Sequence, residues 1–438
     1  MTRLLLLFLT LATVAQAKPA PRPVEAYLQP TVFALTMVMI HDVASPPAAS
    51  RFYAYCLLGA HDLVAQNAKN ITSPTRFVRD FAPAPLAKTE KYDYRLAALY
   101  SILETGRLLL PSGYRLEDDQ KKLLAQLKEN GYSQAIIDAS VRVAQTEASR
   151  VLAYAATDNY RLLSARTRYR PTQGDGYWYP TPPGYIEAIE PHWRTIRPML
   201  LDSCNQFKPT PPVAFSKDTT SAFFALTREV YDTGNALTDE QRAVAAYWDC
   251  NPFAINTSGH MMIGFKKISP GGHWLNIAAL AVERAKTPFD RAVLVQSVAA
   301  MTLMDAFISC WDEKYRSNRI RPETVINRYI NPRWQPLLQT PPFPEYTSGH
   351  SVISTAVAEV LTYMLGPDFA FTDNTEIIFD LPERQFTSFR QAAQEAAISR
   401  LYGGIHYRDA IENGQTQGSA IGSFVVQKLK KAGIKPAP

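Results

Sequence analysis

The chain has 438 residues, of which 46% are hydrophobic and 20% charged, and its formal net charge at pH 7 is +6. This length can bury one large core or two packed halves, and this composition excludes a disordered chain. The mild positive charge, without a dense basic run, indicates neither a nucleic-acid partner nor an anionic membrane surface.

The first residues have the pattern of a secretory signal. Arg3 precedes an apolar run over residues 4–14, and Ala15-Gln16-Ala17 has the small-residue spacing of a cleavage site. We therefore expect a signal peptide over residues 1–17, cleavage after Ala17, and export to the periplasm or the cell exterior. An exported chain can form zero, one or two disulfides from its four cysteines, whose spacing shows no metal pattern: Cys56, Cys204, Cys250 and Cys310.

Apolar residues at helical spacing predict an all-α chain, with almost no alternating strand pattern. Proline-rich loops at 170–184 and 207–214 separate an N-terminal helical half, residues 18–215, from a C-terminal half, residues 216–438. The predicted helices are 30–44, 48–68, 85–108, 116–130, 132–158, 186–200, 218–233, 238–249, 274–313 (split near Pro288), 351–365, 388–402 and 409–432.

The most apolar stretch after the signal, residues 292–311, predicts a buried helix of a bundle. Four polar residues interrupt it, so it is a poor membrane span; they are Gln296, Ser297, Thr302 and Asp305. No membrane span is therefore expected after the signal.

Lys314 and Arg321 stand two helical turns apart at the end of that helix. Pro322 disfavours helix at the residue before it, so Arg321 is expected at or just past the helix end. Taken alone, this cluster is more typical of a solvated basic helix end.

Ser348-Gly349-His350 directly precedes the predicted helix 351–365. Ser348 is a good N-cap, and the free backbone N–H groups behind it would favour an anion. Gly349 permits a close approach of the backbone, and His350 could exchange protons near neutral pH. The simpler alternative is an ordinary helix cap beside a histidine.

A second copy shows how weak the tetrapeptide is by itself. Thr257-Ser258-Gly259-His260 repeats residues 347–350 letter for letter. No Lys/Arg-Pro cluster precedes it at the same interval, so we expect a loop or a helix cap there.

A third cluster lies near the C-terminus. Arg400 is close to the end of an alanine-rich helix, Gly403-Gly404 supplies the helix stop, and His406 lies in the turn. Asp409 is expected to cap the last helix, and it could also hydrogen-bond a ring nitrogen of His406 and so fix its tautomer.

Together the three clusters resemble those of the vanadium-dependent haloperoxidases, which share their anion site with acid phosphatases and type 2 phosphatidic acid phosphatases. That superfamily has the patterns K-x6-R-P, P-S-G-H and S-R-x5-H-x3-D. Thr347 departs from it by replacing the proline, and Asp409 departs by following His406 after three residues and not four. The matching residues are Lys314, Arg321, Pro322, Ser348, Gly349, His350, Ser399, Arg400 and His406.

The resemblance implies two stacked helical bundles, with the anion site in the C-terminal bundle. His406 would be the vanadium ligand, His350 an acid–base group, and Lys314 would polarise hydrogen peroxide for attack by a halide. Small organic acceptors would then consume the hypohalous acid. One vanadate per chain would be held by Lys314, Arg321, Ser348, Gly349, Arg400 and His406.

Trp311 and Phe343 stand where fungal-type chloroperoxidases have the aromatic residues of the halide side. An apolar wall suits a weakly hydrated halide, so we favour a haloperoxidase acting on iodide or bromide; plain core packing is the alternative. The second candidate is an exported acid phosphatase in which His406 attacks phosphorus and His350 protonates the leaving group. A helical scaffold protein is the third.

Overall fold

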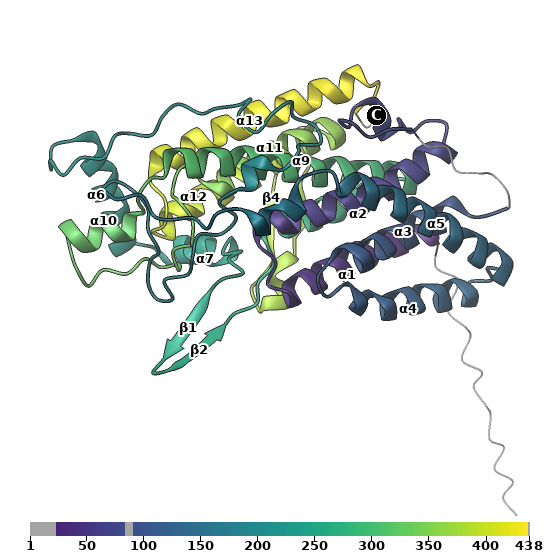
Figure 1. Cartoon of the computed structure of the whole chain (residues 1–438), viewed down its shortest axis with the longest axis horizontal. Helices are drawn as coiled ribbons and strands as arrows, with labels where there is room; N and C mark the ends of the chain where they lie inside the picture. Colours follow the sequence, from purple (N-terminus) through teal and green to yellow (C-terminus); the bar gives the residue numbers. More distant parts are fainter. Residues whose placement is uncertain (1–22, 84–90, 437–438) are drawn as a thin grey trace, which may run out of the picture.

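The computed structural model describes residues 23–83 and 91–436, and the predicted signal peptide lies outside the described residues. The described chain is mainly helical, which confirms the all-α class (Figure 1). The α-helices are α1 (Leu28–His41), α2 (Pro46–Asn67), α3 (Tyr94–Leu109), α4 (Leu116–Glu129), α5 (Gln134–Ala155), α6 (Ala222–Asn235), α7 (Asp239–Tyr247), α8 (Pro270–Arg284), α9 (Phe289–Ser317), α10 (Pro322–Tyr329), α11 (Gly349–Leu365), α12 (Phe389–Tyr402) and α13 (Arg408–Lys431).

Short 3-10 helices and four strands complete the described elements. The 3-10 helices are η1 (Val24–Tyr27), η2 (Pro74–Arg76), η3 (Gly113–Arg115), η4 (Tyr160–Ala165), η5 (Trp193–Thr195) and η6 (Thr375–Phe379). The strands form two antiparallel pairs, β1 (Ile255–Ser258) with β2 (Met261–Gly264) and β3 (Phe371–Asp373) with β4 (Arg384–Phe386).

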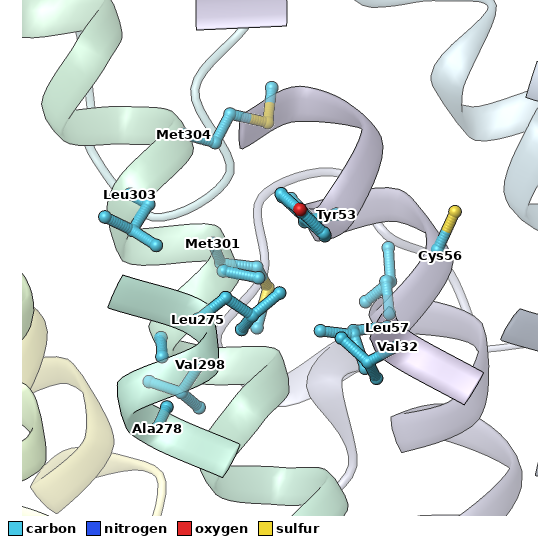
Figure 2. Packing of buried hydrophobic residues seen from close by; sticks show 14 of the residues in the cluster. Val32, Tyr53, Cys56, Leu57, Leu275, Ala278, Val298, Met301, Leu303 and Met304 are labelled. Atoms are coloured by element: carbon cyan, nitrogen blue, oxygen red, sulfur yellow. The ribbon is translucent and has the colours of Figure 1, made fainter. Parts of the chain in front are cut away.

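Helices α1 to α5 gather at one end of the molecule, and α11, α12 and α13 lie towards the other (Figure 1). Helix α9 runs between them, packing against α2 on one side and α11 on the other. Buried apolar side chains of α9 join those of α2 and α11 in one cluster, so both ends of the molecule share one continuous core. In Figure 2, Tyr53 and Leu57 of α2 face Met301 and Val298 of α9, with Leu275 of α8 between them. The domain boundary at residue 215 stays a prediction.

A glycine stripe on α13 sets the position of α11. Gly414, Gly418 and Gly422 are spaced one helical turn apart, so they share one face. A Cβ on Gly418 would lie 2.3 Å from the carbonyl oxygen of Val352, and one on Gly422 would lie 2.7 Å from that of Ala356. Only glycine permits this approach, which brings the N-terminus of α11 against the start of α13.

Most predicted helices are confirmed, with shifted ends. Pro288 separates α8 from α9 as predicted. The predicted helix 85–108 begins only at Tyr94, because the Asp93 side chain caps it by accepting hydrogen bonds from the amides of residues 95 and 96; residues 84–90 lie outside the described chain. The predicted cap of the last helix is wrong, since α13 begins at Arg408 with Asp409 in its first turn.

The predicted helix 186–200 is wrong. Only η5 forms there, because Pro191 and Pro198 lack the N–H groups that a helix would need and clash with the preceding turn. Helix α10, which was not predicted, begins at Pro322, a residue well suited to a first helical position.

Helix α9 is the one described helix long and apolar enough to cross a membrane, but its most apolar stretch is entirely buried in the protein. Within the described chain all four cysteines are free. Both findings suit a bundle whose stability rests on its core.

Candidate active site

A cavity of about 40 Å³ lies at the N-terminus of α11. It is bounded by residues from several parts of the chain: the loop after α7, α9, the 341–350 segment and the turn after α12. The predicted site residues in its wall are Gly349, His350, Arg400, His406, Trp311 and Phe343. Six predicted site residues that are spread over positions 311 to 406 of the sequence therefore line one cavity.

Lys314 lies behind this wall and is fully buried. Its ammonium group donates hydrogen bonds to the carbonyl oxygens of Pro344, Glu345 and Thr347, at 3.1, 3.1 and 2.6 Å. An ammonium group has three protons, so each of them has a partner here. Lys314 thus fixes the loop before α11 and contributes its charge to the cavity; a direct bond to an anion would replace one carbonyl.

Arg321 joins the loop before α11 to the turn after α12. It is the N-cap residue of α10, just past the end of α9, as predicted. Its Nε donates to the carbonyl of Phe343 at 3.0 Å and its Nη1 to that of Ile405 at 2.8 Å. The same Nη1 lies 3.3 Å from Nε2 of His406. The guanidinium therefore holds positive charge beside the histidine nitrogen that faces the cavity.

The predicted hydrogen bond between a ring nitrogen of His406 and the Asp409 carboxylate is wrong. His406 Nδ1 lies 2.8 Å from Oε1 of Glu345, an acid that the sequence reasoning missed. Asp409 instead accepts two hydrogen bonds of 2.8 Å from Arg319, whose Nη1 is also 3.5 Å from the other oxygen of Glu345. A chain Asp409–Arg319–Glu345 thus leads to His406. The available signal was an acid inside the otherwise apolar segment 341–346.

Arg400 reaches the cavity from α12 and is nearly fully buried. Its Nε donates to the hydroxyl of Ser399 at 3.1 Å, and its Nη2 donates to the carbonyl of Trp248 at 2.9 Å. The Ser399 hydroxyl in turn donates to Ala396. Ser399 and the loop after α7 therefore fix the orientation of this guanidinium.

The start of α11 has the predicted geometry. Ser348 is the N-cap, and its hydroxyl accepts a hydrogen bond from the amide of Ser351 at 3.4 Å. A Cβ on Gly349 would lie 3.8 Å from Trp311 and 3.9 Å from the Lys314 side chain. The absent side chain therefore leaves a cradle beside the helix N-terminus. His350 follows, and its buried Nε2 has no hydrogen-bond partner among the described residues.

Burial and the cluster of cations keep both histidines neutral. Burial lowers the pKa of His350 well below its usual value, and the charge of Arg400 lowers it further. The same holds for His406, whose neighbouring charges are Arg321 and Lys314. A neutral imidazole offers a lone pair for ligation or proton transfer.

The other buried ionisable groups are shifted by the same environment. Burial lowers the pKa of Lys314 to about 8 and that of Arg321 to about 10. Burial raises the pKa of Glu345 to about 7, against the opposing effect of Arg319. A bound anion would offset the cost of keeping these cations charged and dry.

The aromatic residues form an apolar side of the cavity. The rings of Trp311 and Phe343 lie 4.9 Å apart between centroids, and Phe307 packs on Trp311 at 5.4 Å. The ammonium of Lys314 lies 5.1 Å from the Phe343 ring centre, within range of a cation–π contact. These residues also belong to the main hydrophobic core, so they pack in the core and line the cavity at the same time.

The residues present fit a tetrahedral oxyanion such as vanadate. Arg400, two neutral histidines and a helix N-terminus with a glycine cradle line one cavity, and Arg321 and Lys314 lie directly behind its wall. The unpartnered Nε2 of His350 is the kind of buried polar atom that a bound group would satisfy.

Comparisons with known proteins bear on the family of this chain. A family model described as the second helical-bundle domain of VCPO matches residues 295–433. A solved structure described as the first bacterial vanadium-dependent iodoperoxidase is 42% identical with a TM-score of 0.86, covering 92% of this chain and 96% of that one. A search among curated proteins finds no match.

More distant structures share the fold. Holo and apo forms of a bacterial vanadium-dependent chloroperoxidase are each 14% identical with a TM-score of 0.66. The holo form matches over 95% of this chain and 97% of that one, and the apo form over 97% and 96%. With 42% identity along nearly the whole length of the iodoperoxidase and the site residues in place, the chain belongs to the vanadium-dependent haloperoxidases.

Proposed function

We propose that this haloperoxidase is an exported enzyme that prefers iodide, with bromide second and chloride poorest. As a member of its family, it oxidises halide with hydrogen peroxide to hypohalous acid and uses vanadate as its cofactor. The aromatic-walled cavity carries the proposal, since Arg400 and two neutral histidines line it and Arg321 and Lys314 lie directly behind its wall. The iodide preference is supported by the 42% identity to a bacterial iodoperoxidase and by the ease with which iodide is oxidised.

The roles of the residues follow from their contacts. Arg321 and Arg400 would bind anionic oxygens through charge-assisted hydrogen bonds, and the backbone N–H of Gly349 would add a neutral donor. Glu345 holds the proton on Nδ1 of His406, so the lone pair lies on Nε2, where ligation would replace the 3.3 Å contact with Nη1 of Arg321. Vanadate, when bound, supplies the Lewis-acidic centre that activates hydrogen peroxide towards a halide.

His350 is placed to move the proton. Its Nε2 is unpartnered among the described residues and its imidazole is neutral, so it can accept a proton from hydrogen peroxide. Trp311 and Phe343 present a dry surface to the incoming halide, which costs least for the weakly hydrated iodide. Small organic acceptors outside the cavity would then consume the hypohalous acid.

The alternative phosphatase uses the same residues, but the comparisons do not favour it. Both activities can be measured on one preparation, with iodide, bromide and chloride plus peroxide in one arm and an aryl phosphate in the other. We expect peroxidase activity in the order iodide, bromide, chloride. Chloride turnover equal to that of iodide would contradict the preference, and phosphatase activity without peroxidase activity would contradict the function.

Cofactor binding is tested by vanadium analysis of desalted protein after incubation with orthovanadate. We expect about one vanadium per chain, because the cations and the helix N-terminus converge on one cavity. The His406→Ala variant should lose both vanadium and peroxidase activity, and the His260→Ala variant should keep both. Full vanadium retention in His406→Ala would argue against the site.

The proposed export rests on the pattern of residues 1–17. Expression of the full chain, followed by cell fractionation and N-terminal sequencing, should recover a protein that begins at Lys18 outside the cytoplasm. An intact N-terminus in the cytoplasmic fraction would contradict it.

A further inference from the structure

A thiol, an imidazole and a carboxylate converge beside the vanadate site, and the thiol also lines its cavity. Cys250 lies in the loop after α7, His273 in α8 and Glu376 in η6. One ligand atom from each lies within 4.8 Å of the others, and all three residues are buried. Cys250 Sγ is 3.4 Å from Nδ1 of His273, and Oε1 of Glu376 is 3.0 Å from the same nitrogen.

These separations are close to those of ligands on one zinc ion. Typical bonds of about 2.3 Å to sulfur and about 2.0–2.2 Å to nitrogen and oxygen, at tetrahedral angles, give roughly 3.5 Å between sulfur and nitrogen and roughly 3.4 Å between nitrogen and oxygen. The two observed distances to Nδ1 of His273 differ from these by a few tenths of an ångström, and the sulfur and the carboxylate oxygen lie within 4.8 Å of each other.

The surroundings of His273 are also those of a metal ligand. Its Nε2 lies 2.7 Å from Oδ2 of Asp373, whose other oxygen accepts hydrogen bonds from the amide and the hydroxyl of Thr375 at 3.0 and 2.6 Å. A metal-bound histidine usually donates its second ring N–H to a carboxylate, which leaves the first nitrogen free to ligate. Asp373 would therefore hold Nδ1 in the form that binds a metal.

Glu376 supplies an independent observation. Its Oε1 is buried and accepts no hydrogen bond from any residue that the structure describes, although it points at the thiol and the imidazole. A buried carboxylate oxygen without a partner is costly. A cation between the three ligand atoms would satisfy it, and so would a proton on Nδ1 of His273, which lies 3.0 Å away.

We propose that Cys250, His273 and Glu376 bind one zinc ion, with Asp373 as the residue that orients His273. A thiolate and an imidazole select zinc over magnesium or calcium, which prefer oxygen ligands. Three protein ligands leave the fourth position to a water molecule.

The ion would stabilise the loop after α7, which orients Arg400. The indole of Trp248 stacks on His273, with 4.6 Å between ring centroids and 15° between planes. The carbonyl of Trp248 accepts the hydrogen bond from Arg400, and Cys250 itself lines the vanadate cavity. Zinc would thus act through positioning, and its binding does not depend on the proposed halide preference or on export.

The metal-free alternative is an imidazolium held between two carboxylates. Although burial opposes a charge on the ring, Asp373 and Cys250 hold the pKa of His273 well above its usual value. In that state the three groups would form a salt-bridge network that takes up no metal. Metal content therefore separates the two alternatives.

The experiment uses the full chain, incubated with a zinc salt, desalted, and assayed for zinc and vanadium. We expect about one zinc per chain in the wild type and in Cys204→Ala, a cysteine variant outside the cluster. Zinc should be lost in Cys250→Ala and in Glu376→Gln, which keeps the shape of the side chain. Cobalt in place of zinc should give a thiolate charge-transfer band that is absent in Cys250→Ala.

Thermal unfolding supplies a second readout. A chelator should lower the Tm of the wild type and leave that of Glu376→Gln unchanged, because only the wild type would carry the ion. Wild-type protein that retains no zinc, or zinc that persists in both variants, would overturn the site. If Cys250→Ala does not fold, Glu376→Gln still decides the question.

Discussion

The sequence Thr-Ser-Gly-His occurs twice in this chain, in two unlike surroundings. At residues 257–260 it forms the end of β1 and the turn into β2, where Ser258 pairs with Met261 and all four residues are exposed. At residues 347–350 it opens α11, and its first two residues are fully buried. In Figure 1 the β1–β2 hairpin projects away from the helices that enclose the second copy.

The two glycines show the physical difference. Gly259 has a φ of +58°, and a Cβ there would meet nothing within 4 Å. Gly349 is helical, and its missing side chain faces Trp311 and Lys314 across the cavity. The first glycine allows a tight turn, and the second makes room for a ligand. The tetrapeptide has no fixed structure of its own, because the surrounding chain decides whether it forms a turn or the start of a helix.

The histidines should show this contrast most strongly. His350→Ala should retain vanadium, because the three cations remain, and should slow turnover by roughly 10²–10⁴-fold, as is typical of lost general acid–base catalysis. His260→Ala should change neither. Steady-state rates and vanadium content of the two variants provide the measurement. If His350→Ala loses vanadium and His406→Ala retains it, the roles of the two histidines are reversed.

The glycines should respond in opposite ways. In Gly349→Ala the new methyl group makes only ordinary contacts with the protein but occupies the cradle, so vanadate should bind about 5- to 150-fold more weakly, the equivalent of a typical overpacking cost of about 1–3 kcal/mol. Gly259→Ala should keep vanadate affinity and lose about 1–2 kcal/mol of stability from its left-handed φ. Vanadate titration measures the affinity, and denaturant unfolding measures the stability. Equal vanadate affinities in the two variants would contradict the expected difference between the two glycines.

Glu345 lies just before the buried copy, residues 347–350, and contacts His406. Glu345→Gln removes the charge that favours the proton on Nδ1, so we expect vanadate affinity to fall by about 10–100-fold, as for other partners of metal ligands. Asp409→Asn, which reaches His406 only through Arg319 and Glu345, should have a clearly smaller effect. Vanadate titration at one pH, with Tm as the control for folding, compares them. A larger loss in Asp409→Asn would restore the original expectation.

The smallest expected effect is a pH dependence. Burial lowers the pKa of Lys314 to about 8 in the free protein, so its positive charge is present below that pH and lost above it. Vanadate affinity should therefore fall above about pH 8, by up to about tenfold per pH unit. Lys314→Arg stays charged and should lack this fall. Vanadate ionises identically with both proteins, so the difference between their affinity profiles reports Lys314; parallel profiles would contradict the assignment.

The sequence predicted the site better than it predicted the contacts within it. Lys314, Arg321, Arg400 and His406 were named from spacing, and each lies at or directly behind the cavity wall. Glu345 was missed and Asp409 was misplaced, because a partner for His406 is chosen by distance in space and the two acids are 64 residues apart in the chain.

By itself, the sequence determined most of the helices and the residues proposed to bind the anion. These depend on local physics: apolar periodicity, Ser348 as a cap, and Pro288 and Pro322 as helix boundaries. Only the tertiary structure decided that Glu345 lies against His406 and that Cys250 meets His273. Those depend on burial and on contacts between distant segments, such as the close approach of α13 to α11 at its glycines, and no local pattern encodes them.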